Sequence, residues 1–415
     1  MRKIVFVEPL FYGVNLLKKA RVMGFEIIVI ISDANNPIVN HYEGLFDNYI
    51  IANTQDYKSI IESLKRSNYV ESIDAIIPAA DYVTEVTAKV AKILGFRGVN
   101  ETAAKAARDK GLAKELYEQK GVSSAKYAIV TGEESAIANA RKIGYPVVLK
   151  PQNACGSQNV FFISNEEELI EKIADIRQFK YSYLNYKIKD SYLLEEFIDG
   201  PEFSVELYID ESRVKFAEVT EKVVSELPYF VEKMHVLPSS IMKDRKQQII
   251  KAASEAVLAL GFDGGVFHVE VKACNNGEKI IEVNGRPGGD NITSDLLINA
   301  KNVDLYTALI KWYLKEDVVF DNQIEKASAI AYIMPDKKGI VKGIDNIEQI
   351  EKMTEVTRIG FDLDLPCKVD IAHDSDGRIG YVIFTDDDSK KVKQKAEETI
   401  KKIKLIYSAT SEEVS

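Results

Sequence analysis

Residues 266–290, VFHVEVKACNNGEKIIEVNGRPGGD, constrain the fold more than any other stretch of this chain. Two apolar runs flank the polar turn at residues 275–277, and each run carries a glutamate in its middle, Glu270 and Glu282. This pattern predicts two antiparallel strands joined by a tight turn. A shift of one residue in the pairing moves every side chain to the other face of the sheet. The register therefore decides where the two acids lie.

Two registers of this hairpin compete. A two-residue turn at Asn276 and Gly277 pairs Glu270 with Val283 and mixes acids with aliphatic residues on each face. A three-residue turn, with Gly277 in the left-handed conformation, instead places Glu270 opposite Glu282. The second register separates a polar face from an apolar face, and we therefore predict it. The polar face then consists of His268, Glu270, Glu282 and Asn284. The apolar face consists of Phe267, Val269, Val271, Ile281 and Val283.

Opposed carboxylates destabilise a sheet unless a cation lies between them. Mg²⁺ accepts carboxylate and amide oxygens, commonly one or two carboxylates together with substrate phosphates. A single glutamate on a strand is better explained by a solvated outer face. Here two opposed acids are followed by Asn284 and Arg286 on the same face. We therefore predict that Glu270, Glu282 and Asn284 hold a metal ion whose remaining ligands come from a nucleotide.

Residues 145–163, YPVVLKPQNACGSQNVFFI, are a candidate phosphate site. The pattern predicts a strand that ends at Lys150, a loop of small and polar residues, and a second strand. Small residues allow backbone N–H groups to approach a phosphate, and Lys150 adds a positive charge. The motif is not a Walker loop. Taken alone, it also suits an ordinary hairpin.

Residues 193–207, LLEEFIDGPEFSVEL, are a candidate site for a nucleoside. A strand leads into a polar turn and a second strand follows, with Glu195 and Glu202 on either side of the turn. An adenine ring needs apolar walls, backbone groups for its edge and an acceptor for its amino group, whereas a ribose needs a carboxylate for its hydroxyls. Residues 194–198 and Glu202 meet these needs. The alternative is an ordinary hairpin with exposed acids.

The remaining pattern predicts an α/β and α+β chain of three parts. In residues 1–100, buried strands alternate with amphipathic helices, which is typical of a doubly wound parallel sheet, a Rossmann-like domain. Its first turn, EPLFYG, has one glycine where a dinucleotide fingerprint needs three, so we do not predict NAD binding. Residues 101–324 begin with one helix that ends at Gly121 and continue as an α+β region with antiparallel sheets. Residues 325–415 predict a small α+β module.

Composition excludes several classes of protein. The net charge of −10 argues against a general affinity for nucleic acid or an anionic membrane. The three cysteines lie far apart without a C-x-x-C pair, which argues against a disulfide framework or a zinc knuckle. No apolar run is long enough to span a membrane. The short run at the N-terminus ends at Glu8 and Pro9 and predicts a first strand rather than a signal peptide. We expect a cytoplasmic protein.

Four motifs, in this order and spacing, resemble the ATP-grasp superfamily. They are a D-K-x-x-x-K helix (Asp109, Lys110, Lys114), the strand ending in Lys150 with its loop, E-x-F-I-x-G-x-E (Glu195 to Glu202), and E…E-x-N-x-R (Glu270, Glu282, Asn284, Arg286). Each motif alone is weak, but the four together are highly specific. The resemblance covers nearly the whole chain. It implies a pre-grasp domain in 1–100, an ATP-grasp domain in 101–324 with a nucleotide-binding lid in about 125–200, and a ligase-associated domain in 325–415.

The resemblance also implies the roles of the site residues. In such an enzyme Lys110 and Lys150 hold phosphates, Glu195 accepts the adenine amino group, and Glu202 binds the ribose. The backbone at Phe197 and Ile198 takes the adenine edge. Two Mg²⁺ ions, or Mn²⁺ in their place, are held by Glu270, Glu282 and Asn284. Arg286, with Asn284, is catalytic, because its guanidinium neutralises an acylphosphate or grips the incoming carboxylate.

Superfamily ligases activate a carboxylate as an acylphosphate, which an amine attacks to give an amide, ADP and phosphate. The segments HVEVKA, EVNGRPGGD and EKMHVLPSS look most like those of the L-amino-acid ligases, which form dipeptides. We therefore expect amino-acid substrates, and we expect a homodimer. Asp290 is a candidate partner of a substrate ammonium; the alternative is a helix N-cap. His235, predicted in a lid between a strand and a helix, is a candidate substrate contact; the alternative is a solvated loop histidine.

Other functions suit the same motifs. One is a superfamily ligase of another pathway, either purine biosynthesis or the tailoring of an antibiotic or siderophore precursor. Another is a nucleotide-binding protein without turnover. The complete set of Glu270, Glu282, Asn284 and Arg286 argues against the last, because a protein without turnover has no need of opposed acids.

Overall fold

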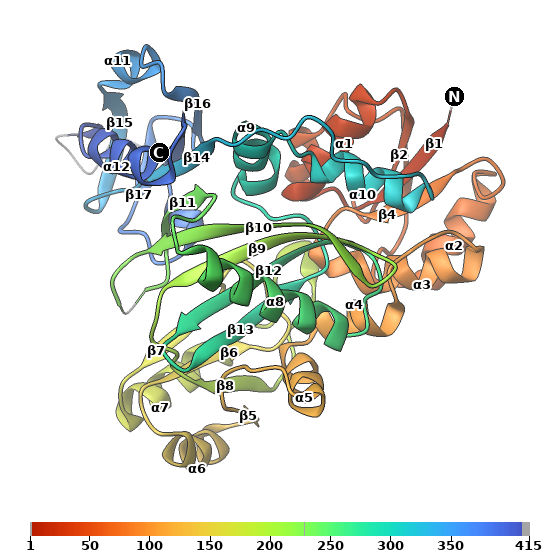
Figure 1. Ribbon diagram of the computed structural model, residues 1–415. Coiled ribbons are helices and arrows are strands. Elements are labelled where there is room, and N and C mark those ends of the chain that lie inside the picture. Colours follow the sequence, from red (N-terminus) through yellow and green to blue (C-terminus); the bar gives the residue numbers. More distant parts are fainter. Residues whose placement is uncertain (1, 228, 409–415) are drawn as a thin grey trace.

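The structure is a computed structural model that describes residues 2–227 and 229–408 (Figure 1). These residues form one parallel sheet and three antiparallel sheets, with helices packed against them. Figure 1 shows the N-terminal part on the right, the central sheet in the middle and the C-terminal part at the upper left. The predicted α/β and α+β fold class is confirmed.

The N-terminal sheet is parallel, as predicted, with strand order β3-β2-β1-β4. Its strands are β1 (Lys3–Val7), β2 (Glu26–Ile31), β3 (Asn48–Ile51) and β4 (Ala75–Pro78). Apolar side chains on one face pack against α2 (Tyr57–Arg66) and α3 (Thr84–Leu94). Those on the other face pack against α1 (Tyr12–Val22) and α10 (Leu305–Tyr313). The second helical layer is therefore completed by a segment from much later in the chain.

Two helices stand where the sequence predicts one helix ending at Gly121. They are α4 (Glu101–Arg108) and α5 (Lys110–Lys120). Asp109 separates them with extended backbone angles, φ −120° and ψ 95°, and its side chain accepts a hydrogen bond from the N–H of Leu112. A capping aspartate at this position starts a new helix. Gly121 ends α5 in the left-handed conformation, as a glycine at this position commonly does.

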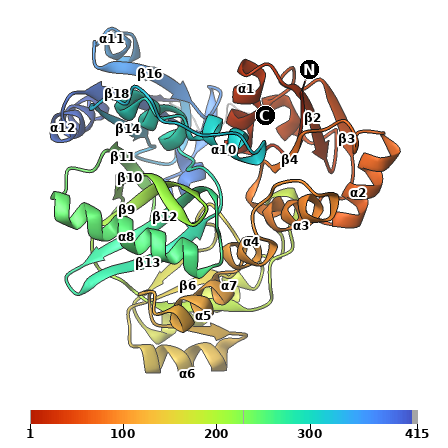
Figure 2. The ribbon, with the colours of Figure 1, turned by 45° about the vertical axis from the view of Figure 1, so that its right-hand side comes forward.

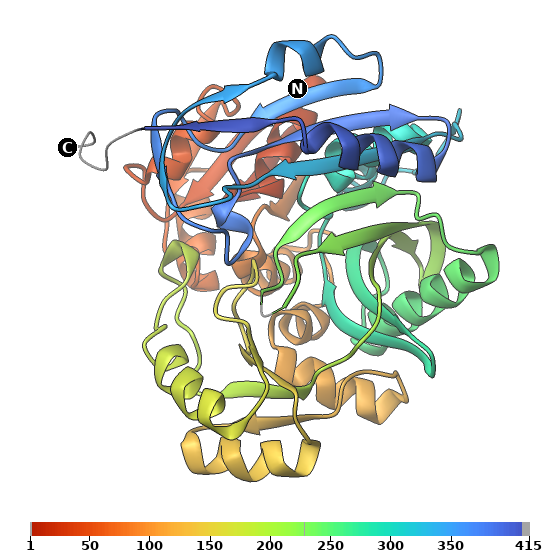
Figure 3. The same cartoon turned by 90° about the vertical axis from the view of Figure 1, so that its left-hand side faces the viewer.

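A small antiparallel sheet follows, with strand order β5-β8-β6-β7. Its strands are β5 (Tyr127–Val130), β6 (Val147–Pro151), β7 (Phe161–Ile163) and β8 (Tyr192–Glu196). Helices α6 (Glu133–Ile143) and α7 (Glu166–Ile176) pack against it around a hydrophobic core of its own. In Figure 3 this unit lies at the bottom of the molecule, in gold and yellow. It falls within the range 125–200 predicted for the lid.

The central sheet has eight strands in the order β13-β12-β9-β10-β11-β14-β18-β16. The first five strands in that order are β13 (Gly277–Asn284), β12 (Gly265–Cys274), β9 (Glu202–Asp210), β10 (Arg213–Val224) and β11 (Glu232–Leu237). Helix α8 (Lys243–Ala259) packs against the apolar face of β12 and β13 (Figure 2). The opposite face is the polar one.

The C-terminal part shares this sheet. Its strands β14 (Ala327–Ile333), β18 (Gly380–Asp386) and β16 (Val356–Phe361) extend the sheet by pairing of β14 with β11. Strands β15 (Gly339–Asp345), β17 (Cys367–Val369) and β19 (Lys404–Tyr407) form a separate small sheet. Helix α12 (Ser389–Ile400) packs against β14 and β18, and α11 (Ile347–Glu351) is short. The hydrogen-bonded sheet thus passes across the boundary predicted at residue 324. The domain boundaries themselves stay predictions.

Short helical segments complete the chain. They are η1 (Pro37–His41), η2 (Asp81–Val83), η3 (Tyr183–Asn185), η4 (Ile292–Leu296), α9 (Leu297–Lys301) and η5 (Ser375–Gly377). Within residues 2–227 and 229–408, no helix combines the length and apolar character that crossing a membrane requires.

Candidate active site

The hairpin of β12 and β13 places Glu270 opposite Glu282 and His268 opposite Asn284. This confirms the predicted pairing of the acids. The predicted turn is wrong, because Cys274 pairs with the glycine at position 277 and leaves only two residues in the turn. A β-bulge next to Glu270 then shifts the register by one residue, so that the acids still meet.

The bulge also corrects the predicted apolar face. Ile280, rather than Ile281, pairs with Val271 and is fully buried with the core. Ile281 instead lines the cavity described next. An extra residue in one strand turns the side chains that follow it to the other face, which the alternation of the sequence cannot show.

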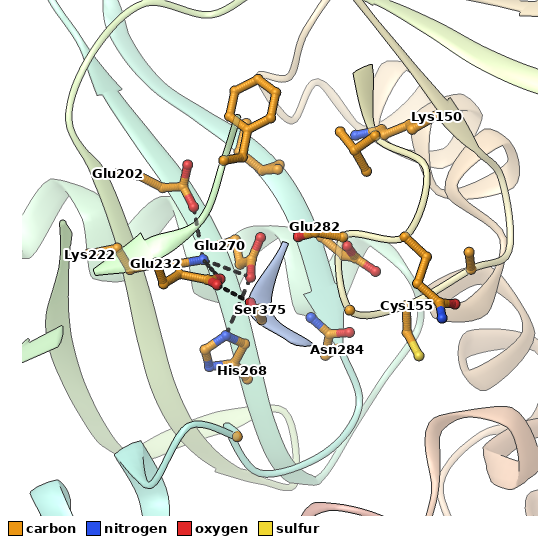
Figure 4. Close-up of a pocket in the computed structure, with 18 of the residues that line it drawn as sticks. Lys150, Cys155, Glu202, Lys222, Glu232, His268, Glu270, Glu282, Asn284 and Ser375 are labelled. Carbon is orange, nitrogen blue, oxygen red and sulfur yellow. Dashed lines mark hydrogen bonds and ion pairs between the residues drawn. The ribbon is translucent and has the colours of Figure 1, made fainter. Parts of the chain in front are cut away.

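A cavity of about 360 Å³ lies on the polar face of the central sheet (Figure 4). Every site residue predicted from the sequence lines it: Lys110, Lys150, Glu195, Phe197, Ile198, Glu202, His235, Glu270, Glu282, Asn284, Arg286 and Asp290. Tyr12 and Asp81 of the N-terminal part and Arg378 of the C-terminal part also line it. The chain therefore brings its predicted motifs together in one place, and three parts of the molecule contribute to that place.

Each of the opposed acids has a lysine partner. The Nζ of Lys110 lies 3.0 Å from an oxygen of Glu282, and the Nζ of Lys222 lies 3.0 Å from an oxygen of Glu270. The repulsion that the sequence predicts between the acids is thus already offset by two cations. Lys110 also donates to the carbonyl of Ala154 in the predicted phosphate loop, at 2.8 Å.

Lys222 is a site residue that the sequence analysis missed. It lies on β10 directly opposite Glu202 of β9, and its side chain is 4% exposed. Its Nζ contacts Glu202 at 2.8 Å and Glu232 at 3.5 Å in addition to Glu270 (Figure 4). Burial lowers the pKa of Lys222, but these three carboxylates outweigh burial and raise the pKa well above its ordinary value. A lysine at an inward position of a central strand is the signal that would have identified it.

The donor set fits a hard divalent cation. Glu270 and Glu282 offer carboxylate oxygens, and Asn284 offers an amide oxygen on the same face. Within the described parts of the chain, no three His, Cys, Asp or Glu side chains are arranged as a complete metal site. The incomplete donor set of Glu270, Glu282 and Asn284 suits an ion that takes its other ligands from phosphates and water. The two-ion site stays a prediction.

Glu195 has two buried lysine partners. Lys114 lies 2.6 Å from one of its oxygens, and Lys150 forms an ion pair with the other. Burial raises the pKa of Glu195, but the two lysines outweigh burial and lower it to about 2. For Lys114 burial prevails and the pKa is lowered, whereas for Lys150 the attraction of Glu195 prevails and the pKa is raised. The predicted contact of Glu195 with adenine stays a prediction.

The segment predicted as a nucleoside site is not a hairpin. Strand β8 belongs to the small sheet and β9 to the central sheet, so residues 197–201 cross from one sheet to the other. The ring of Phe197 packs edge-on against Phe162, with centroids 4.9 Å apart. The N–H of Phe197 donates to the carbonyl of Pro146 at 3.1 Å and is thus used within the protein. Both Phe197 and Ile198 still line the cavity.

Arg286 is paired with an acid of the N-terminal part. Its Nε donates to both oxygens of Asp81, at 2.9 and 3.0 Å. Burial raises the pKa of Asp81, but Arg286 and Arg108 outweigh burial and lower it. Asp81 follows β4 in the motif PAAD, a polar residue after a buried strand, and that position is the signal that would have found it.

Asp290 is paired with an arginine of the C-terminal part. The two terminal nitrogens of Arg378 donate to its two oxygens at 2.8 and 3.1 Å, and the Nε2 of His235 lies 3.3 Å away. Asn291, not Asp290, occupies the N-cap position of the helical segment that follows, and no side chain caps that segment, so the N-cap alternative is wrong. The predicted place of His235 is also wrong, because it lies on β11 and is 1% exposed. No local pattern marks Arg378 in the sequence.

His268 bridges the metal-site acid and the core. Its Nδ1 lies 2.6 Å from an oxygen of the fully buried Glu206, and its Nε2 lies 3.6 Å from Glu270. Burial lowers the pKa of His268, but Glu206 outweighs burial and raises it to about 9. A protonated His268 therefore adds a third cation beside the opposed acids.

Comparison with known proteins agrees with this geometry. Residues 143–295 match the family described as an ATP-grasp domain, and residues 331–408 match L-amino acid ligase C-terminal domain 2. The chain therefore contains an ATP-grasp domain. Proteins with a similar sequence include ligases, among them an alanine–anticapsin ligase and a D-alanine–D-alanine ligase.

The individual relatives of this chain are distant in sequence. The alanine–anticapsin ligase of Bacillus subtilis is 26% identical over 256 residues, which cover 58% of this chain and 54% of that ligase. The chain thus spans about half the length of that relative. The L-amino acid ligase of Bacillus licheniformis has a similar structure, with a TM-score of 0.81, 19% identity and coverage of 98% of this chain and 99% of that one.

A purine-pathway enzyme shares the fold less closely. The structure of phosphoribosylglycinamide synthetase from Anaerococcus prevotii matches with a TM-score of 0.71 and 21% identity. The match covers 98% of this chain and 100% of that enzyme's chain. At these identities the structural likeness concerns the fold alone.

Proposed function

We propose that this protein is an ATP-dependent ligase that joins the carboxylate of one amino acid to the amine of another and releases ADP and phosphate. The observation that carries the proposal is the convergence of two charge systems in one cavity. One comprises the opposed acids with their lysines, and the other comprises Arg286 and Asp290. The first suits a nucleotide with its metal, and the second suits two zwitterionic substrates.

In the proposed complex the nucleotide lies between the small sheet and the central sheet. Lys110 and Lys150 face its phosphates, and Glu202 faces the ribose. Backbone groups at Phe197 and Ile198 face the adenine. Both lysines are now paired with Glu282 and Glu195, so phosphate binding requires that they exchange a carboxylate partner for a phosphate. Such charge-assisted contacts are the stronger hydrogen bonds in proteins.

Mg²⁺, held by Glu270, Glu282 and Asn284, would neutralise the distal phosphates as the γ-phosphoryl group is transferred. The side chains of this chain would supply positioning and charge. Arg286, fixed by Asp81, neutralises the acylphosphate or grips a carboxylate. Asp290 faces a substrate ammonium. No side-chain nucleophile is needed, because the substrate amine attacks the acylphosphate.

The match of residues 331–408 to an L-amino acid ligase domain supports amino acids as the substrates over purine precursors. The test is a screen of amino-acid pairs for ATP-dependent phosphate release, with mass spectrometry of the products. We expect at least one pair to give a dipeptide. The proposal would be contradicted if no amino-acid pair gave phosphate release and a purine precursor did. The purine substrates to test are phosphoribosylamine with glycine, and aminoimidazole ribonucleotide with bicarbonate.

A further inference from the structure

The turn Arg286-Pro287-Gly288-Gly289-Asp290 connects the metal-site strand β13 to η4, and both of its charged ends line the cavity. Each end forms an ion pair with a different flanking part of the molecule. Arg286 pairs with Asp81 of the N-terminal part, and Asp290 pairs with Arg378 of the C-terminal part. The turn is thus held from both sides.

The ion pair between Arg286 and Asp81 fixes the orientation of the arginine side chain. Both oxygens of Asp81 accept from the Nε of Arg286, and one terminal nitrogen of Arg286 donates to the carbonyl of Pro287 at 2.9 Å. The side chains of Arg286 and Asp81 are 18% and 10% exposed. An arginine held through its Nε keeps its guanidinium plane in one orientation. Asp81 therefore determines how Arg286 faces the cavity.

The pair with the C-terminal part is a two-pronged contact. Two nitrogens of Arg378 meet the two oxygens of Asp290, and the guanidinium lies over the ring of Tyr332 at 3.9 Å. The hydroxyl of Tyr332 donates to the backbone carbonyl of Asp290 at 3.3 Å. Asp290 has a φ of +52°, which a non-glycine residue adopts only when its surroundings hold it. These contacts supply that hold.

The middle of the turn rests on the buried acid of the central sheet. A Cβ at Gly288 would lie 2.7 Å from an oxygen of Glu206 and 2.8 Å from the Nδ1 of His268. The turn therefore has no room to move toward the sheet. The two ion pairs restrain the ends of the turn, one from the N-terminal part and one from the C-terminal part.

We propose that Asp81 and Arg378 are positioning residues for the amino-acid end of the cavity, and that they act by holding the turn 286–290 between the two flanking parts. This inference rests on the proposed function, because it assumes that Arg286 and Asp290 face the amino-acid substrates. The nucleotide end has ion pairs of its own, since Lys110 pairs with Glu282 and Lys150 pairs with Glu195.

The experiment compares Asp81→Asn and Arg378→Gln with matched control variants. Lys19→Gln breaks an ion pair of 2.6 Å between the N-terminal part and Asp304, and Arg358→Gln breaks one of 3.1 Å between the C-terminal part and Asp295. Neither control residue lines the cavity. Arg378→Lys keeps the charge without the two-pronged contact.

We expect Asp81→Asn and Arg378→Gln to raise the KM for an amino-acid substrate by about tenfold or more, a typical result of losing a charge-assisted contact. Binding of a non-hydrolysable ATP analogue, measured by calorimetry, stays at the wild-type value. Arg378→Lys recovers part of the loss, and both controls behave like the wild type. Wild-type KM values in both test variants, or equal losses in the controls, would overturn the proposal.

A second readout needs no turnover. Hydrogen exchange of peptides covering residues 284–296, measured without substrates, should be faster in Arg378→Gln than in Lys19→Gln, whose lost partner Asp304 lies outside this segment. If exchange in Arg378→Gln equalled that of the wild type, Arg378 would not restrain the turn 286–290. If exchange changes as expected while the wild-type protein turns over no amino-acid pair, the proposed function fails and the structural role of Arg378 is upheld.

Discussion

At the scale of single residues, the lysines beside Glu270 and Glu282 change what the acids do for stability. If the two acids only repelled each other, removal of one of them would make the metal-free protein more stable. The partners Lys222 and Lys110 reverse that expectation, because Glu270→Gln or Glu282→Gln removes an attraction as well as a repulsion. The free energy of unfolding of the metal-free protein should therefore fall, by about 1–2 kcal/mol.

The same variants test the metal site. A Mg²⁺–nucleotide complex that binds only the folded wild type raises its melting temperature by mass action. We expect that rise to be lost in Glu270→Gln and Glu282→Gln, as measured by thermal unfolding with and without Mg²⁺ and an ATP analogue. An equal rise in the variants would rule out these acids as metal ligands.

Glu195 predicts a pH dependence of stability. Its pKa is lowered from 4.5 to about 2 in the folded protein, because Lys114 and Lys150 outweigh its burial. A lowered carboxyl pKa stabilises the fold at pH values above the ordinary pKa, and this contribution is lost as the pH falls toward the folded pKa. Glu195→Gln should therefore reduce the free energy of unfolding by up to about 3 kcal/mol at pH 6.

That deficit should shrink as the pH falls from 4.5 toward 2, since the carboxyl group then binds a proton in the unfolded wild type while it is still ionised in the folded wild type. Urea denaturation of wild type and variant at a series of pH values measures it. A deficit that does not change with pH would show that Glu195 acts through shape rather than charge.

At the scale of elements, two neighbouring glycines offer a matched pair. Gly288→Ala places a methyl group 2.7 Å from Glu206 and 2.8 Å from His268, whereas Gly289→Ala meets no atom within 4 Å. We expect Gly288→Ala to lower the free energy of unfolding by about 1–3 kcal/mol, as overpacking in a well-packed site does. Gly289→Ala should lie close to the wild type. Chemical denaturation measures both, and equal effects would contradict the described position of the turn.

Elements also show how far the sequence determines the structure. The pairing of Glu270 with Glu282 was predictable, because polar and apolar residues alternate within residues 267–271 and 281–284. The turn and the bulge were not, since several turn types suit the same residues. The crossing from β8 to β9 was not predictable for a similar reason, since two strands joined by a polar turn also suit a hairpin. Alternation shows that a segment is a strand, but it does not show which strand is its partner.

Long-range pairs lie beyond sequence reasoning of this kind. Arg286 and Asp81 are 205 positions apart, and Arg378 and Asp290 are 88 apart. No local spacing relates either pair. The motifs around Lys150 and Asn284 were predictable because each is contiguous and each chemistry needs particular residue types.

At the scale of the whole molecule, the cavity depends on all three parts. The central sheet continues into the C-terminal part through β11 and β14, and α10 returns to complete the N-terminal layers. The part predicted at 325–415 is therefore structurally continuous with the central sheet. Arg378 reaches the site from that part, which explains how it contributes to a cavity formed mainly by other segments.

The central claim is that the cavity transfers the γ-phosphoryl group of ATP to a carboxylate. Chromatography of the nucleotide products, with an amino-acid pair that supports turnover, tests this claim most directly. We predict ADP and orthophosphate in equal amounts, formed together with a dipeptide and absent in Glu282→Gln. AMP with pyrophosphate as the stoichiometric products would contradict it.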